Sequence, residues 1–257
     1  MLRRMTTATL ARITRYPVKG LSGQTLDRID LVPDAGIPED RRFALAHGAS
    51  AFDPDAPAWK PKSNFLVLAK NARLAQLDTD YDAATTTLTV RRGGRQVARG
   101  DLSSPTGRLL IQQFFAAYMG EEAYGKVRVV EVPGFMFSDV PQKVLSLVGA
   151  ASLADLERVT GAPVDPRRLR GNLLVEGAPA WAEFEWVGRE ITVGGVRLAV
   201  EGRIDRCAAT EVNPKTGERD MMLPRLLRKG YGHIECGVYA RVLTAGRIAV
   251  GDGVAVG

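Results

Sequence analysis

Runs of β-favouring residues that turn at glycine pairs dominate the hydrophobic pattern of this chain. One such pattern occupies residues 85–100 and another occupies residues 189–202, and each contains two consecutive glycines at its centre. Glycine pairs provide the backbone conformations of tight β-turns, and a strand on either side of the turn makes a hairpin. The pattern therefore predicts two β-hairpins in a chain that consists mostly of strands.

Helices are expected in three places, over residues 104–120, 152–161 and 222–230. Ser104 is suited to be the N-cap of the first helix, and Pro105 fits its first turn. In the second helix, Ser152 is followed three residues later by Asp155, which resembles a capping box. A glycine ends each of the three segments.

These elements predict a mainly β protein with a few helices, in the α+β class. The Pro- and Asp-rich stretch 52–64 is interpreted as an irregular loop and not as a linker between domains. The boundary is placed near the first helix. It divides the chain into an N-terminal β-barrel-like module, residues 1–103, and a second β-barrel, residues 104–257, which includes the connecting helix.

Composition and charge narrow the class of protein. With 45% hydrophobic residues the chain can bury a sizeable core, and no apolar segment has the length of a membrane span or of a signal peptide. The net charge of +6 is spread along the chain, which suits a small anionic ligand better than a nucleic acid. Adjacent arginines such as Arg167-Arg168 are typical of solvated faces. We therefore expect a cytoplasmic protein with no membrane and no nucleic acid partner.

The segment RCAATEVNPKTG, residues 206–217, carries the candidate chemistry. It is interpreted as a strand-like run that opens on Cys207, one of only two cysteines in the chain. Nearby Arg203 and Arg206 favour a thiolate, which suits metal ligation or nucleophilic attack, although a free cysteine in a strand is also commonly structural. The other cysteine, Cys236, has apolar neighbours and is interpreted as a packing residue.

Several motifs occur in one order along the chain: YPVKG (16–20), GI-x-x-DRRF (36–43), SLADLE (152–157), RRLRGNLLVEG (167–177), W-x-E (181–183), RCAATEVNPKTG (206–217), GVYARVL (237–243) and GRIAVGD (246–252). Together they resemble the MOSC domain family, named for the C-terminal part of molybdenum cofactor sulfurase, with the β-barrel module that precedes it. The resemblance covers nearly the whole chain. It implies an N-terminal MOSC-associated barrel packed on a C-terminal MOSC barrel.

This resemblance implies a molybdenum cofactor (molybdopterin) site like that of the mitochondrial amidoxime-reducing component and its bacterial relatives. In those proteins the metal is carried by a pterin dithiolene and ligated by the cysteine of RC-x-x-T, which is Cys207 here. A soft thiolate suits a thiophilic metal. The residues that match cofactor-binding positions are Lys19, Arg41, Ser152, Arg170, Asn172 and Arg206.

Each of these donors also has an ordinary structural interpretation. Ser152 can be a helix cap and nothing more, Asn172 can hydrogen-bond the backbone of a turn, and Arg170 can pair with a carboxylate. The chain also departs from the family pattern. Gly20 stands where the family commonly has serine, Gly149 where a polar residue is frequent, and Lys62 where arginine is frequent.

The implied reaction is the two-electron reduction of a small N-hydroxylated substrate, such as an amidoxime, a hydroxylamine or an N-hydroxylated base. The sequence has no four-cysteine run for a fused iron-sulfur domain, so the electrons are expected from a separate donor protein of the ferredoxin type, or of the cytochrome b5 type with its reductase. Candidate proton donors are Asp139, Glu183, Asp205 and His233, each of which is also a common structural residue.

Three other functions remain open at this point. A carrier would hold the molybdenum cofactor, or a sulfur atom on Cys207, and pass it on without turnover. A thiol enzyme would pair Cys207 with His233. A nucleic-acid-binding barrel would use the positive charge, and its binding would weaken steeply with salt.

Overall fold

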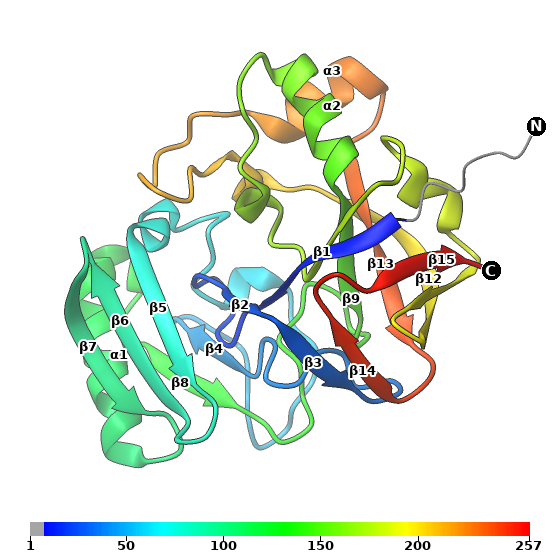
Figure 1. The fold of residues 1–257 in the computed structure, drawn as a ribbon. Coiled ribbons are helices and arrows are strands. Elements are labelled where there is room, and N and C mark those ends of the chain that lie inside the picture. Colours follow the sequence, from blue (N-terminus) through cyan, green and yellow to red (C-terminus); the bar gives the residue numbers. More distant parts are fainter. Residues whose placement is uncertain (1–7) are drawn as a thin grey trace, which may run out of the picture.

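A closed barrel of seven strands is the central feature of the computed structural model, which describes residues 8–257 (Figure 1). Its strands in chain order are β1 (Ala8–Arg15), β9 (Leu145–Gly149), β10 (Leu173–Glu176), β11 (Glu190–Val193), β12 (Val196–Asp205), β13 (Glu235–Val242) and β15 (Gly253–Val256). They follow the order β10, β9, β13, β12, β11, β15 and β1, and the pairing of β1 with β10 closes the barrel. The expected mainly β fold with a few helices is confirmed.

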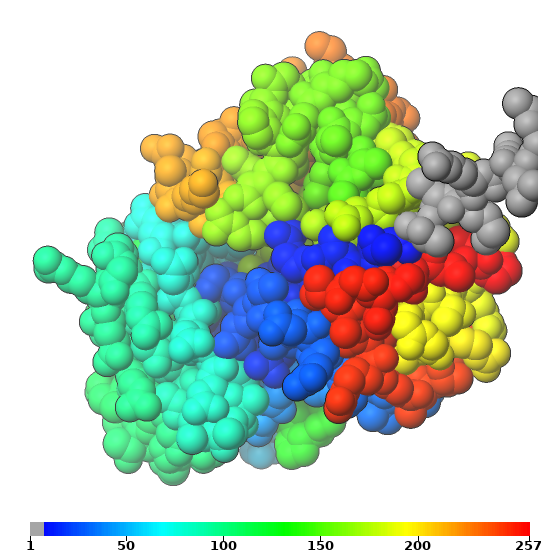
Figure 2. Space-filling view, in the orientation of Figure 1, coloured from blue at the N-terminus to red at the C-terminus, as the bar shows by residue number. Residues whose placement is uncertain are grey.

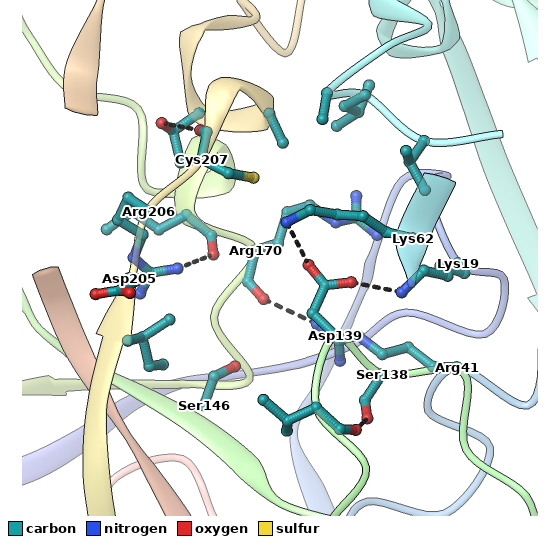
Figure 3. Close-up of a pocket in the computed structure, with 18 of the residues that line it drawn as sticks. Lys19, Arg41, Lys62, Ser138, Asp139, Ser146, Arg170, Asp205, Arg206 and Cys207 are labelled. Atoms are coloured by element: carbon teal, nitrogen blue, oxygen red, sulfur yellow. Dashed lines mark hydrogen bonds and ion pairs between the residues drawn. The ribbon is translucent and has the colours of Figure 1, made fainter. Parts of the chain in front are cut away.

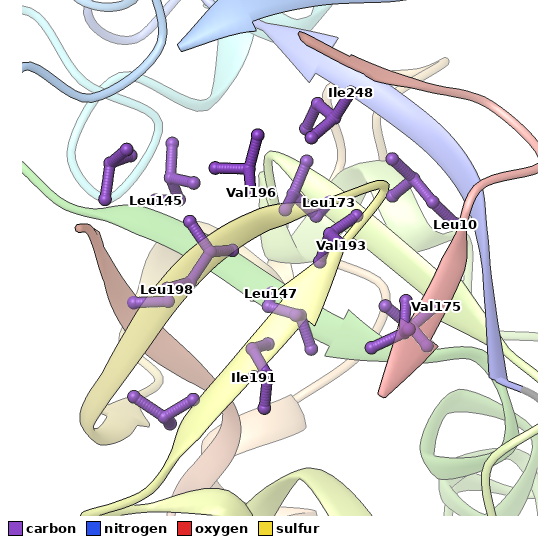
Figure 4. Packing of buried hydrophobic residues seen from close by; sticks show 14 of the residues in the cluster. Leu10, Leu145, Leu147, Leu173, Val175, Ile191, Val193, Val196, Leu198 and Ile248 are labelled. Atoms are coloured by element: carbon purple, nitrogen blue, oxygen red, sulfur yellow. The ribbon is translucent and has the colours of Figure 1, made fainter. Parts of the chain in front are cut away.

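Aliphatic side chains fill the interior of this barrel (Figure 4). Alternate residues of a strand point inward, as Ile191 and Val193 do on β11. On β1 the fully buried Leu10 and Ile13 are three residues apart, because a register shift between Leu10 and Arg12 inserts an extra residue. The packed interior gives the loops at the barrel's ends a rigid support.

Three smaller sheets lie beside the barrel (Figure 1). They pair β3 (Arg28–Leu31) with β14 (Gly246–Ala249), β4 (Phe43–Ala46) with β8 (Arg128–Glu131), and β6 (Thr87–Arg92) with both β5 (Leu77–Asp82) and β7 (Arg95–Asp101). The short β2 (Gln24–Leu26) pairs with β1 outside the closed barrel. Because β1 pairs with β15 and β3 pairs with β14, segments near the beginning and the end of residues 8–257 lie side by side (Figure 2).

The three helices are α1 (Pro105–Met119), α2 (Ala150–Thr160) and α3 (Leu223–Tyr231). Ser104 caps α1 as predicted, since its Oγ accepts a hydrogen bond from the Gly107 N–H at 3.0 Å. The buried face of α1, which includes Ile111 and Phe115, packs with the β5–β6–β7 sheet. The boundary expected at residue 104 places this helix in the second module, but its most extensive contacts are with β7 in the first, and it also packs against β8.

The predicted start of α2 is wrong. The helix begins at Ala150 with Gly149 as its N-cap, so Ser152 lies inside the first turn and makes no capping box. The Ser152 hydroxyl donates instead to Glu183 Oε2 and accepts from the Trp181 N–H, both at 2.8 Å. Its polar group is therefore used by a distant segment of the chain.

The predicted end of α3 is also wrong. The helix passes Gly230 and is capped by Gly232, which has a left-handed φ of 80°. A Cβ at Gly230 would come within 2.7 Å of a Val159 methyl on α2. Gly230 thus allows close packing of two helices and does not end one.

Both predicted hairpins are confirmed, as the β6–β7 and β11–β12 pairs. The segment 206–217 is not a strand, because β12 ends at Asp205 and a 3₁₀ turn follows. The 3₁₀ turns are η1 (Lys62–Asn64), η2 (Ala72–Gln76), η3 (Gly120–Ala123), η4 (Pro166–Leu169), η5 (Ala182–Trp186) and η6 (Ala208–Glu211). Within residues 8–257 no helix has the length and apolar character required to cross a bilayer.

Candidate functional site

A cavity of about 440 Å³ brings Cys207 together with segments from both halves of the chain (Figure 3). Its cationic lining residues are Lys19, Arg41, Lys62, Arg168, Arg170, Arg203 and Arg206. The acidic ones are Asp139 and Asp205. This excess of positive charge makes the cavity a site for an anionic ligand.

The turn that follows β12 presents the Cys207 thiol to this cavity. The Cys207 carbonyl accepts hydrogen bonds from the Thr210 N–H at 3.0 Å and from the Thr210 hydroxyl at 2.8 Å, which explains the spacing of RC-x-x-T. Figure 3 shows the sulfur pointing toward the Lys62 amine. Burial disfavours the charge of Lys62, but Asp139 and Cys207 outweigh it and raise the pKa of this amine. A protonated amine therefore stands beside the thiol.

Arg206 holds that turn from behind. Its side chain is 7% exposed, and it donates from Nε to the Cys236 carbonyl at 2.7 Å and from Nη1 to the Leu169 carbonyl at 2.8 Å. Its Nη2 also donates to the Cys236 carbonyl. These bonds join the residue that follows β12 to β13 and to the end of η4. The donors of Arg206 are thus directed at the backbone, and its expected contact with a cofactor stays a prediction.

Arg41 and Arg170 both lie close to the ring of Tyr16, with their guanidinium carbons 5.0 Å and 4.3 Å from its centroid. Both arginines have a φ of 51°, in the left-handed region that non-glycine residues seldom adopt. Arg41 Nη2 donates to the Arg170 carbonyl at 3.2 Å, and Asp40 pairs with Arg41 from the other side. Burial lowers the pKa of Arg170 to about 10, so it remains charged at neutral pH. The guanidinium groups of Arg41 and Arg170 are thereby held together at the cavity wall.

Asp139 links two lysines across the cavity (Figure 3). It accepts from Lys19 Nζ at 2.5 Å and from Lys62 Nζ at 3.3 Å. Burial opposes ionisation, but the two amines hold the pKa of Asp139 well below its usual range. Burial in turn lowers the pKa of Lys19. Asp139 is thus an ionised acceptor near neutral pH, and its role as a proton donor stays a prediction.

Two family models match this chain. The MOSC N-terminal beta barrel domain matches residues 7–125, and the MOSC domain matches residues 135–255. The chain belongs to the MOSC domain family. The cavity is lined by residues from both matched regions.

Among proteins of known name, the chain is similar to molybdenum cofactor sulfurase of Drosophila melanogaster, with 27% identity over 90% of this chain and 31% of that protein. The sulfurase of Drosophila erecta is 28% identical over 50% of this chain and 17% of its own length. The chain thus spans at most about a third of these relatives. Similar solved structures include YuaD of Bacillus subtilis, with a TM-score of 0.46 and 16% identity over 99% of this chain and 97% of that chain. YiiM of Geobacillus stearothermophilus has a TM-score of 0.34 and 18% identity over 44% of this chain and 53% of that chain.

The MOSC-type residues expected at the cofactor divide into two groups in the structure. Cys207, Lys19, Arg41, Arg170, Asn172 and Arg206 line the cavity. Ser152 does not line it and is fully buried in its bonds to Glu183 and Trp181. Asn172 lines the wall, but its Oδ1 accepts from both the N–H and the hydroxyl of Ser146. Its amide therefore helps to join β9 and β10.

The other candidate acids occupy different surroundings. Glu183 is 1% exposed and accepts from Ser152 and from the Gly149 N–H, so it belongs to the support of α2. His233 does not line the cavity, and its Nδ1 accepts the N–H of Glu235 at 3.2 Å. Asp205 does line the cavity and is exposed.

Arg168 is a site residue that the sequence analysis missed. The Arg167-Arg168 pair was expected on a solvated face, yet Arg168 is only 5% exposed. It donates to the Glu211 carbonyl at 3.1 Å and pairs with Asp220 at 2.6 Å, while its Nε has no hydrogen-bond partner. Its partners are more than forty residues away in the chain. A local pattern of charges gave no sign of them.

The presence of glycine at position 20, where the family commonly has serine, has a structural reason. Gly20 has a φ of 85°, and a Cβ there would lie 2.4 Å from the Leu66 carbonyl oxygen. We expect Gly20→Ser to lower the free energy of unfolding by about 1–3 kcal/mol, because the side chain meets backbone and the φ is strained. Urea denaturation measures this change. Gly93→Ser is the matched control, since a Cβ at that left-handed turn meets nothing within 4 Å. Equal losses in the two variants would contradict the packing argument.

The pairing of Asp139 predicts a pH dependence of stability. A folded-state pKa below the unfolded value of about 4 stabilises the protein above that pH, and the stabilisation is lost as the pH falls through the folded pKa. We expect the stability of wild type to fall more steeply than that of Asp139→Asn below about pH 5. The difference should not exceed about 1 kcal/mol, because the Asp139 side chain is 47% exposed. The free energy of unfolding of both proteins is measured by urea denaturation at several pH values. If it changes with pH equally in the two proteins, the ion pairs of Asp139 contribute nothing to stability.

Proposed function

We propose that this MOSC protein binds a molybdenum cofactor in the cationic cavity, with Cys207 as its metal ligand. One observation carries the proposal: a thiol and a set of cations from distant parts of the chain converge on one cavity (Figure 3). A single soft thiolate suits a metal whose other sulfur ligands come with a cofactor. The surrounding positive charge suits the anionic remainder of such a group.

The donors present fit that group chemically. Arg41 and Arg170 offer planar forks that match a phosphate, while Lys19 and Lys62 offer point charges. Lys62 replaces the arginine frequent in the family, and its salt bridge to Asp139 fixes its position in the cavity. We expect the arginines to hold the phosphate and Lys62 to offset negative charge beside Cys207.

The proposed reaction is the reduction of a small N-hydroxylated substrate to the corresponding amine or amidine. When bound, the cofactor supplies the two-electron redox chemistry, and the chain positions it and the substrate. Electrons are proposed to come from a separate donor protein, of the ferredoxin type or of the cytochrome b5 type with its reductase. The protonated Lys62 and the ionised Asp139 set the charge at the site.

A second candidate is a carrier that holds the cofactor, or a sulfur atom on Cys207, and passes it on. The names of the curated relatives, molybdenum cofactor sulfurase, favour this candidate. The carrier would use the same cavity and the same thiol. Turnover of an N-hydroxylated substrate distinguishes the two functions, because only the reductase would show it.

The test is to purify the full chain from a host that makes the cofactor and to measure its molybdenum and pterin. The loaded protein is then incubated with benzamidoxime or hydroxylamine and a chemical electron donor. Stoichiometric cofactor with turnover supports the reductase, whereas cofactor without turnover but with transfer to an apo-molybdoenzyme supports the carrier. Folded protein that takes up neither metal nor pterin would exclude the reductase and the cofactor carrier, and a carrier of sulfur on Cys207 would then be tested by mass spectrometry of the intact protein for a persulfide.

A further inference from the structure

A second cavity of about 220 Å³ adjoins the first and shares Arg168 and Arg170 with it. It is otherwise bounded by β1, the segment 20–25, η2 and the beginning of β5. None of the cofactor-binding residues expected from the family resemblance lies in it except Arg170. It therefore offers space that the proposed cofactor site does not use.

The charged residues that line this second cavity are mostly arginines. Arg12, Arg167, Arg168 and Arg170 line it, opposed by one carboxylate, Asp78. The Arg168 Nε is buried without a hydrogen-bond partner, and within residues 8–257 the Arg12 guanidinium has no hydrogen-bond or ion-pair partner. A buried donor left unpaired costs about 1–3 kcal/mol, so an anionic acceptor at this wall would be favourable.

Apolar side chains also line the second cavity. Leu21, Leu74 and Leu77 line it, each 1% exposed, together with the buried ring of Tyr16. A lining that combines arginines with apolar side chains suits a ligand that joins a phosphoryl group to a small ring. The volume is below the range of about 300–1,000 Å³ for drug-sized ligands, so it limits the ring to nucleobase size.

We propose that the second cavity binds a nucleoside phosphate, with the phosphoryl group at the arginines shared by the two cavities and the base against the leucines of the lining. Two sources have this chemistry. The nucleotide is either joined to the phosphate of the cofactor in the first cavity, which rests on the proposed function, or it is a free nucleotide, which does not. The arms of the test separate them.

The first arm uses the full chain purified from a host that cannot make the cofactor. Calorimetric titration with CMP and GMP should give saturable binding, whereas cytidine and guanosine should bind at least about tenfold more weakly because they lack the phosphoryl group. Arg12→Ala and Ala75→Trp alter residues that line only the second cavity, and each should weaken nucleotide binding at least about tenfold. Arg95→Ala, at an exposed hairpin position, is the matched control and should bind as wild type.

Thermal unfolding of each variant shows that it is folded. If Arg12→Ala and Ala75→Trp, both folded, bind nucleotide like wild type, then the nucleotide occupies the first cavity and the proposal is overturned. Absence of nucleotide binding by wild type, together with no nucleotide in the loaded protein, also overturns it.

The second arm uses the cofactor-loaded protein. Mild acid hydrolysis followed by mass spectrometry measures released nucleoside monophosphate against pterin. Equal amounts of the two would identify the joined form, and pterin without nucleotide, combined with binding in the first arm, would identify the free one. If protein purified from the cofactor-making host contains no pterin but still binds CMP or GMP, the proposed cofactor function is rejected and the second cavity's ligand is still supported.

Discussion

Cys207→Ala is expected to lower the molybdenum content of the protein at least about tenfold, since even residues that only support a metal ligand change metal affinity by about 10–100-fold. The thiol is partly exposed and points into the cationic cavity, so its loss removes the expected ligand without opening the core. Metal analysis of protein from the same host measures this change. Pterin should be lost less completely, because Arg41 and Arg170 would still hold the phosphate.

Cys236→Ala is the matched control. Cys236 is fully buried, and burial raises the pKa of its thiol to about 12, which keeps it neutral and unsuited to metal ligation. This variant should retain its metal and lose only packing stability. The opposite outcome, metal kept by Cys207→Ala and lost by Cys236→Ala, would remove the assignment of the ligand. It would also leave the cationic cavity without a link to the metal.

Local features of the fold were predictable because their causes are local. The glycine pairs at the two hairpins and the Ser104 cap act over a few residues, and the structure has them where the sequence indicates. The predictions that α2 begins at Ser152 and that α3 ends at Gly230 were wrong because partners distant in the sequence decide the roles of these two residues. The Ser152 hydroxyl bonds to Glu183 and Trp181, and Gly230 makes room for Val159. A single sequence carries no sign of either contact.

The site shows the same division. Cys207 and several cationic residues could be named from motifs, and the structure brings them to one cavity. The roles of Asp139 and Arg168 could not be predicted, because their partners Lys19 and Asp220 are far away in the sequence. The strand expected through Cys207 also fails for a long-range reason. Pairing of β12 with β13 ends at Asp205 and Glu235, and the chain then turns into the cavity.

Arg206→Met is expected to lower the free energy of unfolding by about 2–4 kcal/mol, because buried acceptors left unpaired cost about 1–3 kcal/mol each. The guanidinium satisfies the carbonyls of Cys236 and Leu169 and lies close to Gly237, where an added Cβ would come within 3.1 Å of Nη2. Methionine keeps much of the apolar stem and removes these bonds. Urea denaturation of the cofactor-free chain isolates this structural effect.

Arg203→Met, near the end of β12 and three residues before Arg206, provides the comparison. Arg203 is exposed, its salt bridge to Glu235 spans 3.3 Å, and its loss should change stability by no more than about 0.5–1 kcal/mol. If Arg206→Met is as stable as Arg203→Met yet loses pterin, then Arg206 contacts the cofactor directly. If it is strongly destabilised, and its residual folded protein also holds less molybdenum, then Arg206 acts by positioning the turn that carries Cys207. The geometry favours the second result, because the hydrogen bonds of Arg206 are made to the backbone behind that turn.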